Sequence, residues 1–145
     1  MSASELTNKI RANIPLSEAM QFTIEQLDVE RIRVTAPLTP NINIHGTGFA
    51  GSIYSVGILT GWALCTHIID ELGLDADLVV ARAEIDYRAP VTSALECHSS
   101  TDASQRDTFL QSFRERGKGK LVLEISVGDA PQASLHATFV AVARG

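Results

Sequence analysis

The feature that most constrains this sequence is a long stretch without charge. Between Arg33 and Asp70 there is no Asp, Glu, Lys or Arg. The second half, Phe49 to Ile69, could span a membrane by length alone. Three glycines and several polar side chains interrupt it, however, so it is a poor insertion signal. A helix that is apolar on all sides can instead be buried by its own protein. We expect that arrangement, with no membrane contact.

Length and composition point to one globular domain, residues 1–145. The chain is 45% hydrophobic and 20% charged, which is typical of a protein with a real core. Its net charge of -5 argues against a nucleic-acid surface, which needs clustered Lys and Arg.

The two cysteines favour a reduced, cytoplasmic protein. Cys65 and Cys97 lie in apolar surroundings, and no CxxC spacing is present. We interpret them as small buried residues, not as a disulfide or a metal site. The first residues, Met1 to Leu6, lack a basic region followed by an apolar one, so no export signal is visible.

The first half of the chain predicts two helices around a pair of strands. A short helix is expected over Ser4 to Ile14, with Ser4 as its N-cap. Pro15 restarts the chain into Leu16 to Met20. The elements that follow are strands at Phe22 to Leu27 and Arg31 to Pro37 with a hairpin tip at Asp28 to Glu30, a loop at Leu38 to Gly48, and a helix at Phe49 to Leu72 that stops at Gly73.

The second half predicts strands only. In the first of them, every second residue from Val79 to Tyr87 is apolar. The expected strands are Asp77 to Pro90, Leu95 to Thr101, Thr108 to Glu115, Leu121 to Val127 and Ser134 to Val142, with turns at 117–120 and 128–131. The long helix would measure over ~30 Å, which is too long to bury unless a sheet wraps around it. We therefore predict an α+β hotdog fold, an antiparallel sheet curled around one central helix.

Three segments resemble the thioesterase-like proteins of the YiiD C-terminal-domain type. They are Asn43-Ile-His-Gly-Thr-Gly-Phe-Ala-Gly-Ser-Ile-Tyr54, Thr60-Gly-Trp62 and Ile85-Asp-Tyr-Arg-Ala-Pro-Val91. The resemblance covers nearly the whole chain. It implies a hotdog dimer in which two sheets join into one, with active sites between the subunits.

The strand around Ile85 and Tyr87 also favours association. Its apolar edge would be a liability if it were exposed in a monomer. We expect a homodimer, with a tetramer as the alternative.

The start of the long helix is the expected site of chemistry. Thioester hydrolysis needs a place for negative charge on the carbonyl oxygen, and the unpaired amides of a helix N-terminus provide one. The small residues Ala50 and Gly51 would let a ligand approach the backbone, so their amides are the candidate oxyanion donors. Alternatively, the small residues serve only tight packing of the helix on the sheet.

Three loop residues converge on the same end of the helix. His45 could be a general base, a carbonyl polariser or a water holder, because its ordinary pKa of ~6.5 suits neutral pH. Alternatively, its imidazole braces a turn. Asn43 could hold a water molecule with its amide, or could satisfy only loop backbone groups. Thr47 completes this candidate catalytic group.

The sequence departs from many hotdog thioesterases in lacking an acid on the early helix. No carboxylate precedes Asp70, at the wrong end, so the base must be His45 or a carboxylate from elsewhere, such as Asp86 or Glu84. Those two share a strand face with Arg82 and Arg88, and the favoured interpretation is that these four side chains form ion pairs. The expected substrate-binding residues are Phe49, Ser52, Tyr54, Arg82, Asp86 and Arg88.

These features favour hydrolysis of an acyl thioester, either acyl-CoA or an acyl-carrier thioester. No metal or separate cofactor is expected, since CoA enters as part of the substrate. Arg114, Arg116, Lys118 and Lys120 could meet the phosphates of CoA, although a charged hairpin turn explains them better. Two alternatives stay open. One is a hydroxyacyl-thioester dehydratase, and the other is a non-catalytic module that binds acyl thioesters.

Overall fold

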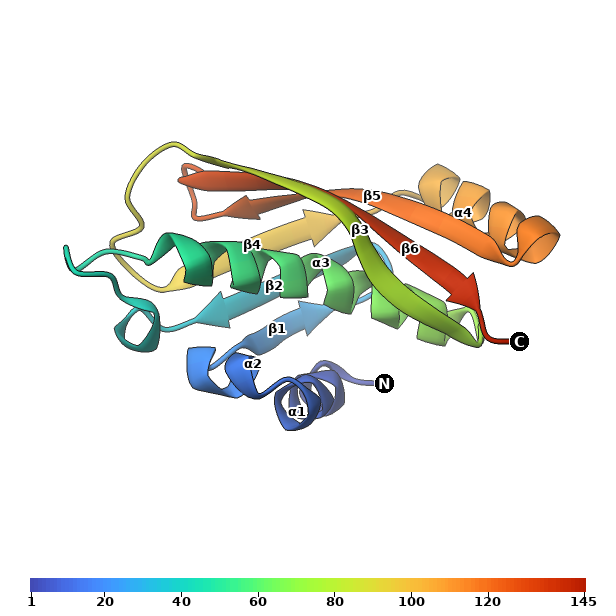
Figure 1. Cartoon of the computed structure of the whole chain (residues 1–145), viewed down its shortest axis with the longest axis horizontal. Coiled ribbons are helices and arrows are strands. Elements are labelled where there is room, and N and C mark those ends of the chain that lie inside the picture. Colours follow the sequence, from blue (N-terminus) through green and yellow to red (C-terminus); the bar gives the residue numbers. More distant parts are fainter.

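One antiparallel sheet of six strands curls around a single long helix, as Figure 1 shows. The computed structural model describes residues 1–145. The strands lie in the order β1-β2-β4-β5-β6-β3. The elements are α1 (Ala3–Asn13), α2 (Pro15–Met20), β1 (Thr23–Leu27), β2 (Arg31–Ala36), the 3-10 turn η1 (Thr39–Asn41), α3 (Ala50–Glu71), β3 (Ala76–Tyr87), β4 (Leu95–Ser100), α4 (Ala103–Arg116), β5 (Lys118–Val127) and β6 (Ala133–Ala143). The predicted hotdog fold is confirmed.

The central helix α3 forms the middle of the core. It is the one helix long and apolar enough to cross a membrane, and 61% of its most apolar window is buried inside the fold. Gly57 and Gly61 let it approach β6 closely. A Cβ atom added at these positions would lie 2.7 Å from the side chains of Leu135 and Phe139, respectively. The prediction that the protein buries this helix itself is therefore confirmed.

A bulge in β3 changes the alternation that the sequence suggested. The register with β6 shifts between Val80 and Arg82, so Ala81 has no partner of its own. Before the bulge Leu78 packs against the core, and after it Ala83 and Ile85 do so. The prediction of one unbroken alternation was wrong, because the extra residue of a bulge reverses the faces of the strand beyond it.

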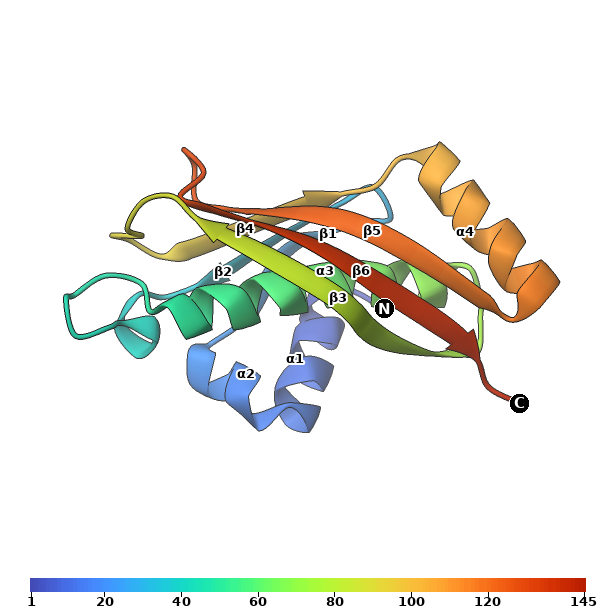
Figure 2. The ribbon, with the colours of Figure 1, turned by 45° about the horizontal axis from the view of Figure 1, so that its top comes forward.

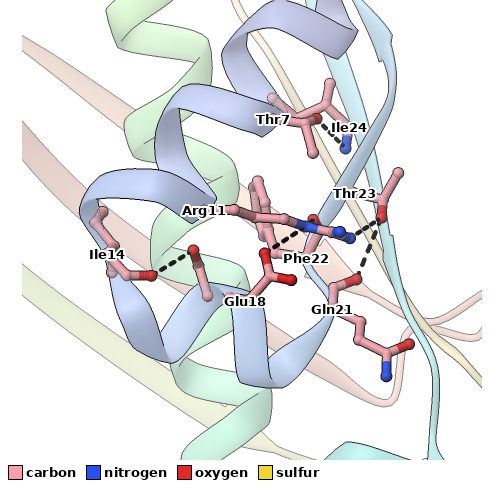
Figure 3. Close-up of polar contacts among 9 residues, drawn as sticks. Thr7, Arg11, Ile14, Glu18, Gln21, Phe22, Thr23 and Ile24 are labelled. Carbon is pink, nitrogen blue, oxygen red and sulfur yellow. Dashed lines mark hydrogen bonds and ion pairs between the residues drawn. The ribbon is translucent and has the colours of Figure 1, made fainter.

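The outer edge of β1 is covered by the N-terminal helices, as Figure 3 shows. Thr7 accepts a hydrogen bond from the amide of Ile24 at 3.0 Å. Arg11 donates to the carbonyl of Phe22 and to the Thr23 hydroxyl, each at 2.8 Å. These contacts satisfy backbone groups that an edge strand would otherwise expose. The N-cap of α1 is Ser2, whose side chain accepts from the Glu5 amide, and not Ser4 as predicted.

The opposite edge of the sheet is bare. β3 is the last strand on that side and pairs only with β6. In both Figure 1 and Figure 2, no helix lies along its outer edge. Val79, Val80 and Tyr87 are exposed apolar residues on this strand. The two edges therefore differ in kind, since one is covered and the other is open to pairing.

The segment predicted as a strand at Thr108 to Glu115 is a helix, α4. Asp102 caps its start by accepting from the Gln105 amide, and Gly117 ends it with φ 69°. The predicted turn at 117–120 is wrong for the same reason, because β5 begins at Lys118. Phe109 and Phe113, four residues apart, are both buried, and this spacing is the helical signal.

Helix α4 packs beside the first part of β5, along which β4 does not extend. The β4–β5 pairing covers only Ile125 to Val127 of β5. Gln105 and Ser112 donate to the carbonyls of Val122 and Lys118, at 2.6 and 2.8 Å. Figure 2 shows α4 at this end of the sheet. The helix thereby supplies donors for strand carbonyls that have no partner strand.

The two cysteines are buried and free, as predicted. Burial raises the pKa of the Cys97 thiol to about 12. Burial raises the pKa of Cys65 as well. Both thiols are thus poor nucleophiles at neutral pH.

Close packing of α3 on β6 makes a prediction about stability. In Gly61→Ala the new methyl group would meet the ring of Phe139, which is fully buried. Overpacking costs about 1–3 kcal/mol, of which the better helix propensity of alanine offsets about 1 kcal/mol. We expect a lower free energy of unfolding in urea titrations.

The double variant Gly61→Ala with Phe139→Leu provides the control. In Phe139→Leu the ring that the new methyl group of Gly61→Ala would contact is absent, so the clash should be relieved. Alone, Phe139→Leu should destabilise the core, because leucine is smaller than phenylalanine. The two substitutions together should therefore cost less than the sum of their separate effects. Additive effects would show that the two side chains do not compete for space.

Candidate active site at the start of the central helix

The loop before α3 is fixed at both ends by a buried asparagine. The side-chain amide of Asn41 donates to the carbonyls of Met20 and Pro37, at 2.9 and 2.8 Å. Its backbone carbonyl accepts from the amide of Phe49 at 2.8 Å. Asn41 therefore ties Phe49, the residue just before α3, to the end of α2. This role could not be predicted from the sequence, because an asparagine in a polar loop gives no sign that it is buried.

Asn43 braces the middle of the loop with its whole side chain. Its Oδ1 accepts from the amides of His45 and Thr47, at 2.9 and 3.0 Å. Its Nδ2 donates to the Thr47 hydroxyl at 2.9 Å and to the Gly48 carbonyl at 3.2 Å. An amide side chain has two donor and two acceptor positions, and all four are used here. Of the two interpretations made from the sequence, this geometry favours bracing over holding water.

His45 lies at the exposed tip of this loop. Its backbone is held by Asn43, and the next residue, Gly46, adopts a left-handed conformation with φ 80°. Its imidazole forms no hydrogen bond or ion pair with the rest of the chain. Both ring nitrogens are therefore open to a ligand or to water.

The first turn of α3 has no side-chain cap. Phe49 is the N-cap residue and its side chain cannot accept a hydrogen bond. The amide of Ile53 donates to the Phe49 carbonyl, whereas those of Ala50, Gly51 and Ser52 have no acceptor in the chain. Free amides at a helix start carry partial positive charge and bind anionic oxygens. The structure thus places free donors at the predicted oxyanion position.

Gly51 packs against the ring of Phe49. An added Cβ atom would lie 2.6 Å from Cε2 of that ring. The missing side chain therefore accommodates a residue of the same chain, and the phenyl ring, which is about half exposed, forms one wall of the helix start. Phe49 thus takes the space beside the Cα of Gly51, and a ligand would approach the Gly51 amide beside that ring.

A tyrosine from β3 ties the sheet to this turn. The Tyr87 hydroxyl donates to the Ala50 carbonyl at 2.8 Å. Burial raises the pKa of Tyr87 above its usual range, and the nearby Tyr54 adds to the shift. The hydroxyl therefore stays protonated and remains a donor at neutral pH. Tyr87 was not among the predicted site residues, although its position in the Ile-x-Tyr strand was a usable signal.

Two predicted substrate-binding residues, Arg82 and Asp86, lie away from the start of α3. Arg82 forms an ion pair with Glu84, as expected for this strand face. Asp86 is exposed and has no ion-pair partner. Both alternate with core-facing residues, so they lie on the face of the sheet that points away from α3. Arg88 donates to the Ser134 hydroxyl at 2.7 Å.

The structure therefore brings together part of the predicted set. Asn43, His45 and Thr47 share one loop, and Ser52 and Tyr54 are half-buried on the first turns of α3 beside Phe49, Ala50 and Gly51. Asp70, the first acid on α3, is at the far end and pairs with the amino group of Met1 at 3.2 Å. No cluster of three His, Cys, Asp or Glu side chains is placed to hold a metal ion.

The bracing role of Asn43 makes a specific prediction. Asn43→Asp keeps the two accepted hydrogen bonds but replaces both donors with an oxygen that faces the Thr47 hydroxyl and the Gly48 carbonyl. Asn43→Ala loses all four contacts. We expect faster amide hydrogen exchange at His45 and Thr47 in the alanine variant, and slower exchange at these amides in the aspartate variant than in the alanine variant. Unchanged exchange in both would show that the loop is held by other contacts.

Comparison with known proteins agrees with this fold. Residues 3–143 match the model of the family described as "Putative thioesterase (yiiD_Cterm)". A solved structure from Shewanella oneidensis, described as a putative thioesterase, is 36% identical, with 97% of this chain and 96% of that chain covered and a TM-score of 0.86.

Two more distant structures share the fold. One is a protein of unknown function from Chlorobaculum tepidum, 23% identical over 98% of this chain and 94% of that chain, with a TM-score of 0.93. The other, from Pseudomonas aeruginosa and described as a probable thioesterase, is 20% identical over 99% and 97%, with a TM-score of 0.87. The chain belongs to the YiiD C-terminal-domain family of thioesterase-like hotdog proteins.

Proposed function

We propose that this protein hydrolyses acyl thioesters, either acyl-CoA or acyl-carrier thioesters, to the free acid and the thiol. The observation that carries the proposal is the start of α3, where the amides of Ala50, Gly51 and Ser52 have no acceptor in the chain. The Tyr87 hydroxyl and the loop bonds of Asn41 hold this turn in place. Fixed donors of this kind stabilise the charge that develops on a thioester oxygen.

The reaction needs one water molecule and no cofactor. The thioester oxygen accepts hydrogen bonds from the Ala50 and Gly51 amides. Water adds to the carbonyl carbon, and the resulting tetrahedral oxyanion is held by the same amides. The C–S bond then breaks, and the thiolate takes up the proton that the water has lost. Each oxyanion donor of this type is worth ~2.7–4 kcal/mol in the transition state.

His45 is the proposed base for the water. It lies on the loop that leads into α3, and its imidazole has no partner in the chain. Asn43 acts as a positioning residue, because it holds the His45 backbone and uses all its own hydrogen-bonding positions to do so.

The proposal includes a homodimer formed through β3. This strand of 12 residues has an unpaired edge, whereas the other edge of the sheet is covered by α1. Exposed apolar side chains at Val80 and Tyr87 lie along it. Pairing β3 with its twin would satisfy the free backbone groups and bury these side chains.

Activity is tested with a panel of acyl-CoAs and a thiol reagent. Release of free CoA from the parent protein supports hydrolysis. Hydration or dehydration of the acyl group without CoA release would identify a dehydratase. Binding without either reaction would identify a non-catalytic module.

The role of His45 is tested by substitution. We expect His45→Ala to lower kcat by ~10²–10⁴, the usual contribution of a general base, with an unchanged melting curve because the side chain is exposed and has no partner in the chain. His136→Ala, which removes an exposed histidine from β6, is the matched control and should keep normal turnover. Equal turnover rates in the two variants would contradict the proposed role of His45 as the base and leave it only a structural role.

Assembly is tested by sedimentation at micromolar concentration. We expect a mass of twice the 15.6 kDa of one chain, and weaker association in Val80→Lys, which adds charge to the free edge. Two dimers associating further would also agree with pairing through β3. A mass of one chain would contradict it.

A further inference from the structure

A groove runs along the flank of α3, away from the start of the helix. One hollow of about 290 Å³ lies between α1 and α3. A second, of about 640 Å³, lies between the later turns of α3 and the start of β3. Lys9, Trp62 and Thr66 line both hollows. We call the two together the α1–α3 groove.

The inner part of this groove is apolar. Leu6, Ile10, Ile14 and Trp62 line the hollow between the two helices. The hydroxyl of Thr66 is buried there and has no hydrogen-bond partner in the chain. Apolar clefts of this size are typical binding sites for small apolar ligands or for the apolar part of larger ones.

Within one subunit the groove is far from the candidate oxyanion donors. Trp62 follows Ala50 by twelve residues, which corresponds to ~18 Å along a helix. A thioester held at the start of α3 would have to pass along several turns of its own helix before it reached the inner hollow.

Pairing through β3 brings the start of the partner's α3 much closer. Side chains directly opposite in an antiparallel pair lie on the same face of the sheet. Matching the faces, placing Arg82 opposite an acid and keeping Tyr87 within the paired segment leaves two registers, with Arg82 facing either Glu84 of the partner subunit or Asp86 of the partner subunit. Allowing for the bulge at Ala81, these place the partner's Tyr87 opposite Leu78 or Val80, respectively.

Both registers lead to the same neighbourhood. Trp62 donates from its indole nitrogen to the carbonyl of Leu78 at 3.3 Å, so the groove and this part of β3 are in contact. Tyr87 is bonded to Ala50 within each subunit. Since paired strands lie ~4.8 Å apart, the first turn of the partner's α3 would lie alongside Trp62 in the proposed dimer.

We propose that the α1–α3 groove of each subunit binds the acyl chain of the thioester whose carbonyl is held at the start of the other subunit's α3. Trp62 and Thr66 determine which chain lengths fit. This assignment rests on the proposed thioesterase function and dimer, and it makes a medium or long aliphatic acyl group the preferred substrate over acetyl.

Binding can be followed without turnover, because Trp62 is the only tryptophan. The probe is S-decyl-CoA, a thioether that cannot be hydrolysed, and CoA alone is the control. We expect a saturable change of tryptophan emission with S-decyl-CoA only. Thr66→Phe, which fills the groove, should abolish the change, whereas Thr66→Val, which only removes the hydroxyl, should keep it. Equal responses to both probes, or an unaltered response in Thr66→Phe, would overturn the assignment.

Turnover gives a second readout. In Thr66→Phe, kcat/KM for decanoyl-CoA should fall about tenfold or more, as expected when two or more methylene groups lose their burial. The value for acetyl-CoA, whose chain is too short to reach the groove, should fall much less. A parent protein that hydrolyses neither substrate would contradict the proposed function, while the emission change would still decide whether the groove binds the chain.

Mixed dimers test whether the two parts of the site come from different subunits. Gly51→Val crowds the helix start, and Thr66→Phe fills the groove. A dimer with one subunit of each kind has one site in which both parts are intact, but only if the site is shared. Unfolding and refolding an equal mixture should therefore restore about a quarter of the parent's activity on decanoyl-CoA.

No recovery in mixed dimers would show that groove and helix start act within one subunit. Melting curves of both variants establish that they fold before mixing, and Gly51→Ala replaces Gly51→Val if the valine variant does not fold.

Discussion

The structure depends on the contact between α3 and the inner face of the sheet. A helix with no charge between Ala50 and Ile69 cannot be stable in water, and a sheet with one apolar face cannot be stable alone. Gly57 and Gly61 let the two approach until Leu135 and Phe139 touch the helix backbone. Because the helix is central, its two ends emerge at opposite ends of the sheet. One of these ends carries the free amides and the braced loop, so the candidate site is a consequence of how the core is built.

The predictable part of the fold followed from features that act over short distances. The uncharged run identified α3, Gly73 marked its end with φ 67°, and alternation identified most strands. Helix α4 was missed because Phe109 and Phe113 lie among polar residues and resemble alternation over a short window. The bulge at Ala81 could not be predicted, because an extra residue in a strand leaves no local pattern in the sequence. It is recognised only from the pairing of β3 with β6.

Less of the candidate site could be predicted from the sequence, for a related reason. Asn43, His45 and the first residues of α3 are neighbours in the chain, so their proximity was evident. The roles within that group depend on which atoms meet. Only the folded loop shows that Asn43 has no hydrogen-bonding position left, and the contact between Tyr87 and Ala50 joins residues 37 positions apart. The missing acid on α3 was visible from the start, and the structure supplies no substitute on the side of the sheet that faces the helix.

The unequal edges of the sheet limit how far the protein can assemble. Thr7 accepts from the Ile24 amide and Arg11 donates to the Phe22 carbonyl, so α1 occupies the outer side of β1, where another strand would have to pair. Pairing of two β3 strands would use the only open edge of each copy, and both outer edges of the joined sheet would then be β1 strands under their helices. Growth by strand addition would stop at two copies. The small helices at the N-terminus would thus act as terminators, protecting the protein from the fibrous aggregation to which open sheets are prone.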